Sequence, residues 1–277
     1  MPEGDTIFRA ARTLHLALAG QAVTRFETQL PHLSRVDDDT PLAGRTVERV
    51  ESVGKWMRMY FSGGLILVTH MLMSGSWHIY RPGEAWQRPR FHMRIVIHTA
   101  RFVAVAFQVP VAEFHTAETL ARHASTQRLG PDVLAPGFDI AEAAQQLRSR
   151  PELELGDALL KQSLVAGIGN VFKSEVCFVS GVNPFRLVSS LSDAELSTIF
   201  TYARALMRSN INETSGDGIV TYTGLRRTTG RTDPSERLWV YHRRGEPCRK
   251  CATPILARKQ GFDARTTFWC PRCQPLP

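Results

Sequence analysis

The tetrapeptides Cys248-Arg249-Lys250-Cys251 and Cys270-Pro271-Arg272-Cys273 stand near the end of the chain, separated by 18 residues. Two Cys-x-x-Cys pairs at this separation are typical of a structural zinc site, in which four thiolates fill every position around the metal. Four of the five cysteines belong to this motif. We therefore expect one structural Zn²⁺ that takes no part in catalysis, held by Cys248, Cys251, Cys270 and Cys273.

The segment between the two cysteine pairs favours a β-hairpin, because residues 266–269 (Thr-Thr-Phe-Trp) are β-branched or aromatic. The fifth cysteine, Cys177, lies in an apolar helical stretch and is expected to be a core thiol. The hairpin would present three basic side chains to a partner: Arg258, Lys259 and Arg265.

The positive charge of the chain is concentrated around this motif. Residues 221–277 hold twelve basic and four acidic residues and so account for the whole net charge of +8, whereas residues 1–220 hold 22 of each. A charge excess at one end indicates a surface for a polyanion, with nucleic acid the first candidate. Tyr222, Trp239 and Tyr241 lie among the arginines and could stack on bases. The alternative is that the surplus arginine only aids solubility.

Length and composition are those of a folded multidomain protein. The chain has 277 residues, of which 43% are hydrophobic and 22% charged, enough for a large core and two or three domains. No apolar run reaches the ~18 residues that a membrane span requires. Asp5, Arg9 and Arg12 interrupt any apolar core of a secretory signal. We therefore expect a cytoplasmic protein with no membrane partner.

The N-terminal part of the sequence predicts one helix followed by a sheet structure. Apolar residues at three- and four-residue spacing predict a helix over about residues 5–18, with Gly20 as its stop. Between residues 23 and 107 the pattern changes to period two, and residues 62–64 (Ser-Gly-Gly) supply a turn. Short strands with glycine-rich turns suggest an antiparallel sandwich or barrel. Strands are expected at residues 47–50, 57–60, 65–68 and 94–97.

The C-terminal part predicts helices. Residues 131–154 are punctuated by proline and are expected to form a linker containing a short helix at 140–148, with a domain boundary near Ala135. Residues 166–170 (Ala-Gly-Ile-Gly-Asn) could turn backbone amides toward a phosphate, or could form a tight turn without a ligand. Further helices are expected at 157–162, at 171–179 and, after a capping box at 192–195, up to Arg208.

The chemically distinctive feature of the N-terminus is Pro2. Removal of Met1 is expected because a small residue follows it, and this leaves Pro2 as a secondary amine. An α-amino group has a pKa of roughly 8, so a fraction is unprotonated near neutrality and can add to a masked aldehyde to give an iminium ion. Glu3 places a carboxyl group beside that amine for proton transfer. On these residues alone, the favoured interpretation is that Pro2 only permits Met1 removal and that Glu3 is a solvated surface charge.

The stretch from His70 to Trp77 (His-Met-Leu-Met-Ser-Gly-Ser-Trp) runs from large apolar residues directly into a turn. It is either a core strand that ends in a turn, which is the commoner arrangement, or an exposed loop in which Leu72 or Met73 acts as an apolar wedge between base steps. Lys55 follows Gly54 at the start of a predicted strand, and a lone lysine there is normally solvated.

Four separated stretches carry a resemblance to a known family: Pro2-Glu3-Gly4, Gly54-Lys55, residues 127–134 (Gln-Arg-Leu-Gly-Pro-Asp-Val-Leu) and residues 166–170. With the cysteine motif and Arg265 ahead of Cys270, the chain resembles the formamidopyrimidine-DNA glycosylase / endonuclease VIII family of base-excision repair enzymes over nearly its whole length. The resemblance implies an α+β multidomain fold. Its parts would be an N-terminal helix and β-sandwich (1–135), a helix–two-turn–helix domain (136–236) and a zinc-finger hairpin (237–277).

The resemblance also implies a bifunctional DNA glycosylase and AP lyase that works by β,δ-elimination. Pro2 would attack the sugar C1′ of a flipped, oxidised nucleotide to form a Schiff base, and Glu3 would protonate the ring oxygen. Lys55 would contact a phosphate and donate a proton in β-elimination, and Arg265 would grip the phosphates that flank the lesion. The partner would be double-stranded DNA with damaged bases or abasic sites, bound by a monomer that is nucleoid-associated if bacterial. The implied DNA contacts are His70, Leu72, Met73, Arg128, Asn170 and Arg265.

The start of the sequence bears on the branch of the family. Pro2-Glu3-Gly4-Asp5 resembles endonuclease VIII, whereas the purine-directed branch begins Pro-Glu-Leu-Pro and carries an Arg-Arg-Phe-Gly wedge that residues 107–111 lack. Oxidised pyrimidines are therefore the expected lesions. The alternatives are the same chemistry on oxidised purines, and a non-catalytic zinc-ribbon protein that binds DNA. Lys161 departs from the Asp usual in the family, and Leu72 from the polar residue that endonuclease VIII can carry.

Overall fold

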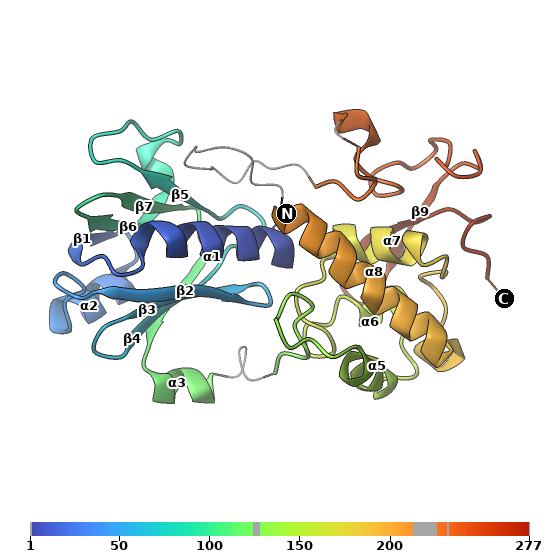
Figure 1. The fold of residues 1–277 in the computed structure, drawn as a ribbon, viewed down its shortest axis with the longest axis horizontal. Coiled ribbons are helices and arrows are strands. Elements are labelled where there is room, and N and C mark those ends of the chain that lie inside the picture. Colours follow the sequence, from blue (N-terminus) through green and yellow to red (C-terminus); the bar gives the residue numbers. More distant parts are fainter. Residues whose placement is uncertain (1, 124–127, 213–225, 232, 277) are drawn as a thin grey trace. The chain divides into compact units, whose positions relative to one another are not determined.

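The computed structural model describes residues 2–123, 128–212, 226–231 and 233–276 (Figure 1). These residues form two compact units, the first made of residues 2–123 and the second of the described residues from Arg128 onward. Within the described ranges, no helix combines the length and the apolar character that crossing a membrane requires.

The first unit is a β-sandwich with a helix at its N-terminus (Figure 1). Helix α1 (Gly4–Leu18) is followed by β1 (Val23–Thr28) and α2 (Pro31–Asp39). A 3-10 helix (Arg90–His92) leads into β6, and α3 (Ala117–Arg122) ends the unit. The other strands are β2 (Val47–Val53), β3 (Trp56–Phe61), β4 (Leu65–His70), β5 (Ser76–Tyr80), β6 (Met93–Thr99), β7 (Val103–Phe107) and β8 (Val111–His115).

Two antiparallel four-stranded sheets make up the sandwich, one in the order β1-β6-β7-β5 and the other in the order β2-β3-β4-β8. Strand β3 buries Met57, Met59 and Phe61 and partly exposes the residues between them, as expected of a strand with one face on a core. Strands β5 and β7 are buried throughout, because a second apolar cluster around Tyr80 and Phe107 covers them as well.

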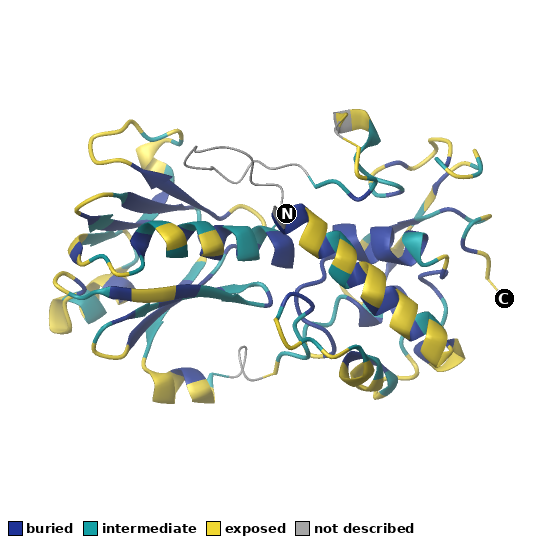
Figure 2. Cartoon of the chain, viewed as in Figure 1, coloured by how far each residue is buried: buried dark blue, intermediate teal, exposed yellow. Residues whose placement is uncertain are grey.

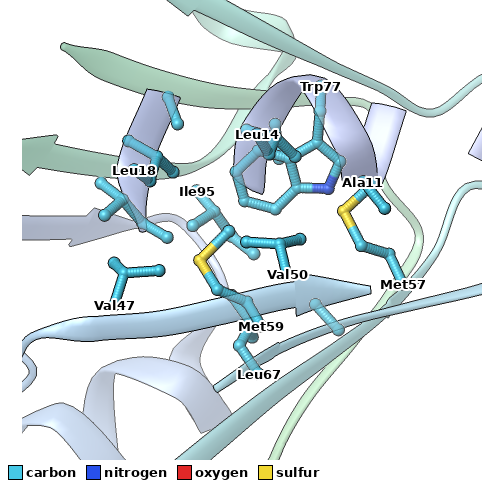
Figure 3. Packing of buried hydrophobic residues seen from close by; sticks show 14 of the residues in the cluster. Ala11, Leu14, Leu18, Val47, Val50, Met57, Met59, Leu67, Trp77 and Ile95 are labelled. Atoms are coloured by element: carbon cyan, nitrogen blue, oxygen red, sulfur yellow. The ribbon is translucent and has the colours of Figure 1, made fainter. Parts of the chain in front are cut away.

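Helix α1 packs into the core between the two sheets. Ala11, Leu14 and Leu18 pack with residues of both sheets (Figure 3). Arg12 and Leu16 are exposed, and the exposed segments of the helix are yellow in Figure 2. The helix predicted over residues 5–18 is thereby confirmed. Burial of each large apolar side chain contributes about 1.5–3 kcal/mol, so this face fixes the position of α1 on the sandwich.

The predicted strands of the first unit are confirmed, since they lie within β2, β3, β4 and β6, and residues 62–64 form the turn between β3 and β4. Helix α2, in contrast, was not predicted. Its last residues, Asp37–Asp39, oppose the helix dipole, and only Pro31 marks its start. Asp37 nevertheless stabilises the following turn, because its Oδ1 accepts a hydrogen bond from Leu42 N at 2.7 Å.

The second unit is helical and ends in a β-hairpin (Figure 1). Its elements are α5 (Ile140–Arg148), α6 (Leu155–Ala158), α7 (Asn170–Val179), a 3-10 helix (Val188–Ser190), α8 (Asp193–Asn212), a 3-10 helix (Pro234–Glu236), β9 (Leu256–Gln260) and β10 (Arg265–Trp269). The capping box is confirmed, because Ser192 Oγ accepts from Glu195 N at 3.2 Å and Glu195 Oε2 accepts from Ser192 N at 2.7 Å. The division into three domains, with limits at 135 and 236, stays a prediction.

The helix predicted at residues 157–162 was wrong in its extent, since α6 ends at Ala158. Gln162 supplies the reason. Its Nε2 donates to Leu160 O at 2.9 Å and to Ile168 O at 3.0 Å, and its Oε1 accepts from Gly167 N at 3.1 Å. The Gln162 side chain thus supplies hydrogen-bond partners to backbone groups of a loop, so this segment does not need to continue as a helix.

Candidate active site and nucleic-acid interface

Pro2 and Glu3 lie at the N-terminal end of α1. Glu3 is the N-cap residue, and its carbonyl accepts hydrogen bonds from Thr6 N at 2.9 Å and from Ile7 N at 3.0 Å. Glu3 is fully buried, which is rare for a glutamate, and Pro2 is half-buried. The partial positive charge of the helix terminus disfavours protonation of the neighbouring amine. The alternative that Glu3 is a solvated surface charge is therefore wrong.

Lys55 occupies the turn between β2 and β3. Val53 pairs with Trp56, so Gly54 and Lys55 form a two-residue hairpin loop. Gly54 has a φ of +59°, and glycine at the first position of such a loop is typical of a type II′ turn, whose twist matches that of the strands. Gly54 is buried and Lys55 is half-buried. The dipeptide thus places the lysine at the tip of the hairpin.

His70 ends β4 opposite Trp56, and the two rings meet edge to face with their centroids 4.7 Å apart. Burial, and then the charge of Lys55, lower the pKa of His70 from 6.5 to about 4, so the ring is neutral near pH 7. Leu72 N donates to His70 Nδ1 at 3.1 Å, which leaves the ring proton on Nε2. His70 therefore fixes the loop that follows it and lies within electrostatic reach of Lys55.

The loop after β4 carries both predicted wedge residues on the surface. Met71 is buried, whereas Leu72 is 48% exposed and Met73 is 63% exposed. Gly75 N donates to Met71 O at 2.8 Å, and a Cβ at Gly75 would lie 2.7 Å from that oxygen, so the turn requires glycine. Leu72 has a φ of +44°, a conformation that costs a residue other than glycine about 1–3 kcal/mol. The core-strand alternative holds for Met71 alone.

These three segments gather at one end of the first unit. The register of β3 and β4 sets Trp56 opposite His70, so the Lys55 turn lies beside the loop that carries Leu72. Along the core, Leu18 lies near Val47, whereas Ala11, closer to the start of α1, lies near Met57 (Figure 3). The first turn of α1 consequently lies at the same end of the sandwich as the Lys55 turn (Figure 1).

In the second unit, one face of α7 positions strand β10. Three of its side chains bond successive residues of the strand: Asn170 Nδ2 donates to Thr266 O (3.0 Å), Lys173 Nζ donates to Thr267 Oγ1 (2.6 Å), and Ser174 Oγ accepts from Phe268 N (3.3 Å). Arg265, the first residue of β10, is exposed directly beside the first of these bonds. The structure thus brings Asn170 and Arg265 together, as two of the predicted DNA contacts.

Arg128 is exposed at the start of the second unit. The motif that contains it, residues 127–134, is described from Arg128 onward and bonds to the motif at residues 166–170. Asp132 forms a parallel bridge with Ala166, and Ala166 N donates to Pro131 O at 2.9 Å. Two stretches that are distant in the sequence therefore form one continuous structure.

The four motif cysteines converge at the base of the hairpin. Their sulfur atoms all lie within 4.8 Å of one another. Three of the separations are Cys248–Cys273 at 3.8 Å, Cys251–Cys270 at 3.4 Å and Cys251–Cys273 at 3.5 Å. A tetrahedron with Zn–S bonds of about 2.3 Å has sulfur atoms about 3.8 Å apart. The cluster therefore fits a zinc ion.

The surroundings of the cysteines also suit thiolates bound to a cation. Lys250 N donates to Cys248 Sγ at 3.4 Å, and Cys273 N donates to Cys270 Sγ at 3.5 Å. Hydrogen bonding with Thr253 lowers the pKa of Cys251 to about 6, whereas burial raises the pKa of Cys270 and of Cys273. A bound metal ion would favour the thiolate forms of Cys270 and Cys273. Burial likewise raises the pKa of Cys177 to about 12, which confirms a core thiol.

Trp239 and Tyr241 do not form the exposed stacking surface that the sequence suggested. Trp239 packs on Phe178 with ring centroids 5.5 Å apart, and Tyr241 packs on Phe268 at 5.1 Å. Both belong to the apolar cluster that supports the zinc finger. Tyr222 lies outside the described residues. The charge distribution alone therefore supports a polyanion partner.

Glu175 was missed in the sequence although it organises this unit. It is fully buried in α7 and accepts hydrogen bonds from Trp239 N (2.8 Å), Val240 N (2.9 Å), Tyr241 N (2.8 Å) and Thr228 Oγ1. The available signal was a charged residue in an otherwise apolar helix, but its partners lie far along the chain. Glu175 anchors the segment that enters the zinc finger to the helix that positions β10.

The sequence matches three protein-family models: the formamidopyrimidine-DNA glycosylase N-terminal domain (residues 1–110), the formamidopyrimidine-DNA glycosylase H2TH domain (residues 129–222) and a zinc finger found in FPG and IleRS (residues 245–276). "Probable endonuclease 8 2" of Streptomyces coelicolor is 39% identical over 100% of this chain and 95% of its own. The "DNA-(apurinic or apyrimidinic site) lyase Nei2" of Mycolicibacterium smegmatis is 36% identical over 99% of both chains. The chain belongs to the formamidopyrimidine-DNA glycosylase / endonuclease 8 family.

Solved structures of formamidopyrimidine-DNA glycosylases share the fold. The complex between Lactococcus lactis Fpg and DNA containing an abasic site matches with a TM-score of 0.80 and 22% identity, over 99% of this chain and 100% of that one. The predicted family and the α+β fold, with its sandwich, helix–two-turn–helix region and zinc-finger hairpin, are thereby confirmed. The zinc-finger match and the clustered sulfur atoms confirm the predicted four-cysteine zinc site.

Proposed function

We propose that this protein removes oxidised pyrimidines from double-stranded DNA through a Pro2 Schiff base and then cleaves the strand by β,δ-elimination. The class of reaction, a DNA glycosylase with AP lyase activity in base-excision repair, follows from membership of the family. One observation carries the assignment to residues. The fully buried Glu3 adjoins Pro2 at the start of α1, at the same end of the sandwich as the Lys55 turn.

Base release begins with the unprotonated nitrogen of Pro2. It attacks C1′, the bond from C1′ to the base breaks, and the proton lost by the amine leaves with the base. The Glu3 carboxyl group donates a proton to O4′, so the bond between C1′ and O4′ opens and an iminium ion joins Pro2 to C1′. A carboxyl group held away from water beside the amine suits this proton transfer.

Strand cleavage uses the same iminium ion as an electron sink. Loss of a C2′ proton forms an enamine, and the 3′ phosphate leaves with the electron pair of its bond to C3′. Loss of a further proton from C4′ expels the 5′ phosphate, and water then hydrolyses the imine to free Pro2. Lys55 contacts a phosphate and donates a proton in the first elimination. Arg265 neutralises the flanking phosphates, and zinc only holds the hairpin that carries it.

The DNA-binding residues have distinct parts in this proposal. An enzyme that acts on a base must extrude it from the stack, and an apolar side chain then fills the gap. Leu72 and Met73 are exposed on the loop beside the Lys55 turn, and His70 holds their loop in place. Arg128, Asn170 and Arg265 contact phosphates from the second unit. The strained backbone of Leu72 fits such a role, because strained residues cluster at ligand-binding sites.

Two observations favour the pyrimidine branch. Two relatives that are 39% and 37% identical to this chain carry the name endonuclease 8. In addition, only residues 108–110 connect β7 to β8, and Val109 among them is fully buried, so this connection offers no exposed arginine wedge. Cleavage of matched duplexes containing thymine glycol, dihydrouracil or 8-oxoguanine separates this branch from the purine alternative. We also expect a monomer that acts in the cytoplasm on nucleoid DNA.

The nucleophile is tested by trapping with borohydride on DNA that contains an abasic site. The mature protein, with Met1 removed, should form a covalent protein–DNA complex, because reduction fixes the iminium ion. A protein with an added N-terminal extension should form none and should lose lyase activity while it keeps its circular dichroism spectrum. The same extension at the C-terminus is the matched control and should trap normally. Full trapping by a verified N-terminally extended protein would refute the assignment of Pro2.

A further inference from the structure

A second cluster of metal-ligating side chains lies on the sandwich, where β8 meets the end of α3. Glu113 and His115 are two residues apart on β8 and so share one face of the strand, and His123 is the C-cap residue of α3. Glu113 Oε2 lies 3.1 Å from His115 Nε2 and 3.3 Å from His123 Nε2. The three ligand atoms all lie within 4.8 Å of one another.

These separations fit a single tetrahedral ion. Ligands at about 2.0–2.1 Å from zinc lie roughly 3.3–3.4 Å apart, close to the two separations measured from Glu113. Two imidazoles and one carboxylate form a recurrent donor set for zinc sites that keep one position for water. The His115 side chain is 10% exposed, whereas those of His123 and Glu113 are 30% and 45% exposed. An ion could therefore enter from solvent and retain a water ligand.

The neighbour of His115 supports a lone pair on its Nε2. Thr119 Oγ1 lies 3.4 Å from His115 Nδ1, and its hydroxyl donates to Thr116 O at 3.2 Å. The Thr119 oxygen can then accept the Nδ1 proton of His115, and the lone pair on Nε2 faces the carboxylate. In this tautomer the Nε2 lone pair is available to a cation that Glu113 also binds, and a ligand histidine oriented through its other nitrogen is a regular feature of metal sites.

We propose that Glu113, His115 and His123 bind one divalent transition-metal ion, with zinc as the preferred occupant. The site is separate from the four-cysteine cluster, and the ion would join β8 to α3. The ion would also help to fix the position of Trp56, whose ring lies 6.4 Å from that of His123. Trp56 in turn contacts His70, with ring centroids 4.7 Å apart, at the end of the unit that holds the proposed active site. The competing explanation is a cluster in which the two histidines only donate hydrogen bonds to Glu113.

Metal analysis of the full-length protein, with its zinc finger loaded, tests the site. After equilibrium dialysis against zinc chloride, the wild-type protein should hold two zinc ions per chain, and the variants His123→Ala and Glu113→Gln should hold one. His98→Ala is the matched control, since His98 Nε2 lies 2.7 Å from Glu27 Oε1 in a pair to which the described residues add no third metal ligand. This control should still hold two zinc ions.

Thermal unfolding gives a readout that is independent of stoichiometry. A ligand that binds only the folded protein raises the melting temperature, so added zinc should stabilise the wild-type protein and the His98→Ala control but neither cluster variant. One zinc ion per wild-type chain at saturation would reject the site, as would a second ion retained by both cluster variants. If His123→Ala fails to fold, Glu113→Gln still tests the site, because it preserves the shape of a side chain that is 45% exposed.

Discussion

At the residue scale, Leu72 combines two unfavourable features on one surface position. Its side chain is 48% exposed, and its backbone occupies the left-handed region with a φ of +44°. The bond from its amide to His70 Nδ1 and the burial of Met71 hold it there. Under the proposed function, a contact between Leu72 and bound DNA would offset these costs.

Replacement of Leu72 by glycine should separate the two features. The variant relieves the backbone strain, so the stability of the folded protein should be unchanged or raised by about 1 kcal/mol. Loss of the apolar wedge should weaken binding to a duplex with an abasic-site analogue by on the order of tenfold, equivalent to about 1.4 kcal/mol. Fluorescence anisotropy and urea unfolding measure the two effects.

A matched control exists on the same unit. Leu16 on α1 is 76% exposed, so Leu16→Ala and Leu72→Ala remove the same apolar atoms from two surface positions. Only Leu72→Ala should reduce DNA affinity. Equal affinities for both variants would show that the loop after β4 does not enter the duplex.

The sequence could identify several of these residues but not their surroundings. Short sequence motifs contain Pro2, Glu3 and Lys55, and Gly54 indicates the turn on which the lysine lies. The burial of Glu3 depends on the packing of α1 against distant strands, which no local pattern records. The exposure of Leu72 was equally hidden, because an apolar residue next to a buried methionine is normally buried as well.

At the element scale, α7 is the helix on which the second unit is assembled. One face bonds β10 through Asn170, Lys173 and Ser174, and Glu175 holds the segment at residues 239–241. Asn170 therefore has a structural role in addition to the DNA contact that the sequence predicted. Because these hydrogen bonds hold the hairpin in place, substitutions in α7 that remove them should displace Arg265.

Glu175→Gln should destabilise the second unit by about 2–3 kcal/mol. Both carboxylate oxygens accept hydrogen bonds from backbone amides, and the NH₂ group of glutamine would face one set of donors and leave them buried without an acceptor. Urea unfolding of the zinc-loaded protein measures the loss. Glu142→Gln, at an exposed position on α5, makes the same chemical change and should be neutral. Equal stability of the two variants would contradict the anchoring role.

Helices that depend on interactions between residues close in the sequence were predicted correctly, and those that depend on more distant residues were not. The helix expected at residues 140–148 and the capping box at 192–195 depend on neighbours within one turn and match the structure. The helix expected at 157–162 fails because Gln162 bonds a loop several residues further on. Helix α2 lacks a local signal, since its acidic end opposes the helix dipole and packing must stabilise it.

At the scale of the whole molecule, charge and chemistry are divided between the two units. Pro2, Glu3 and Lys55 belong to the first unit, whereas Arg128, Asn170 and Arg265 belong to the second. Residues 221–277, where the entire charge excess lies, contribute the described hairpin and zinc finger. Composition could indicate a polyanion partner, but Trp239 and Tyr241 pack against the zinc-finger core instead. We therefore expect electrostatic attraction to the phosphates to contribute most of the free energy of DNA binding.

Arg265→Ala should weaken DNA binding and make it less sensitive to salt. Each phosphate contact releases condensed counterions, so the loss of one contact should reduce the slope of log K against log salt concentration by about 0.9. The measurement is a titration of anisotropy at several salt concentrations with an abasic-site duplex.

Arg35→Ala removes the same charge from α2, at the end of the sandwich opposite the first turn of α1 (Figure 1), and should leave the slope unchanged. If both variants shift the slope equally, binding responds only to net charge. If neither does, Arg265 makes no phosphate contact and its assignment to the reaction fails. A change confined to Arg265→Ala would place the phosphate contact on the strand that α7 and the zinc ion hold together.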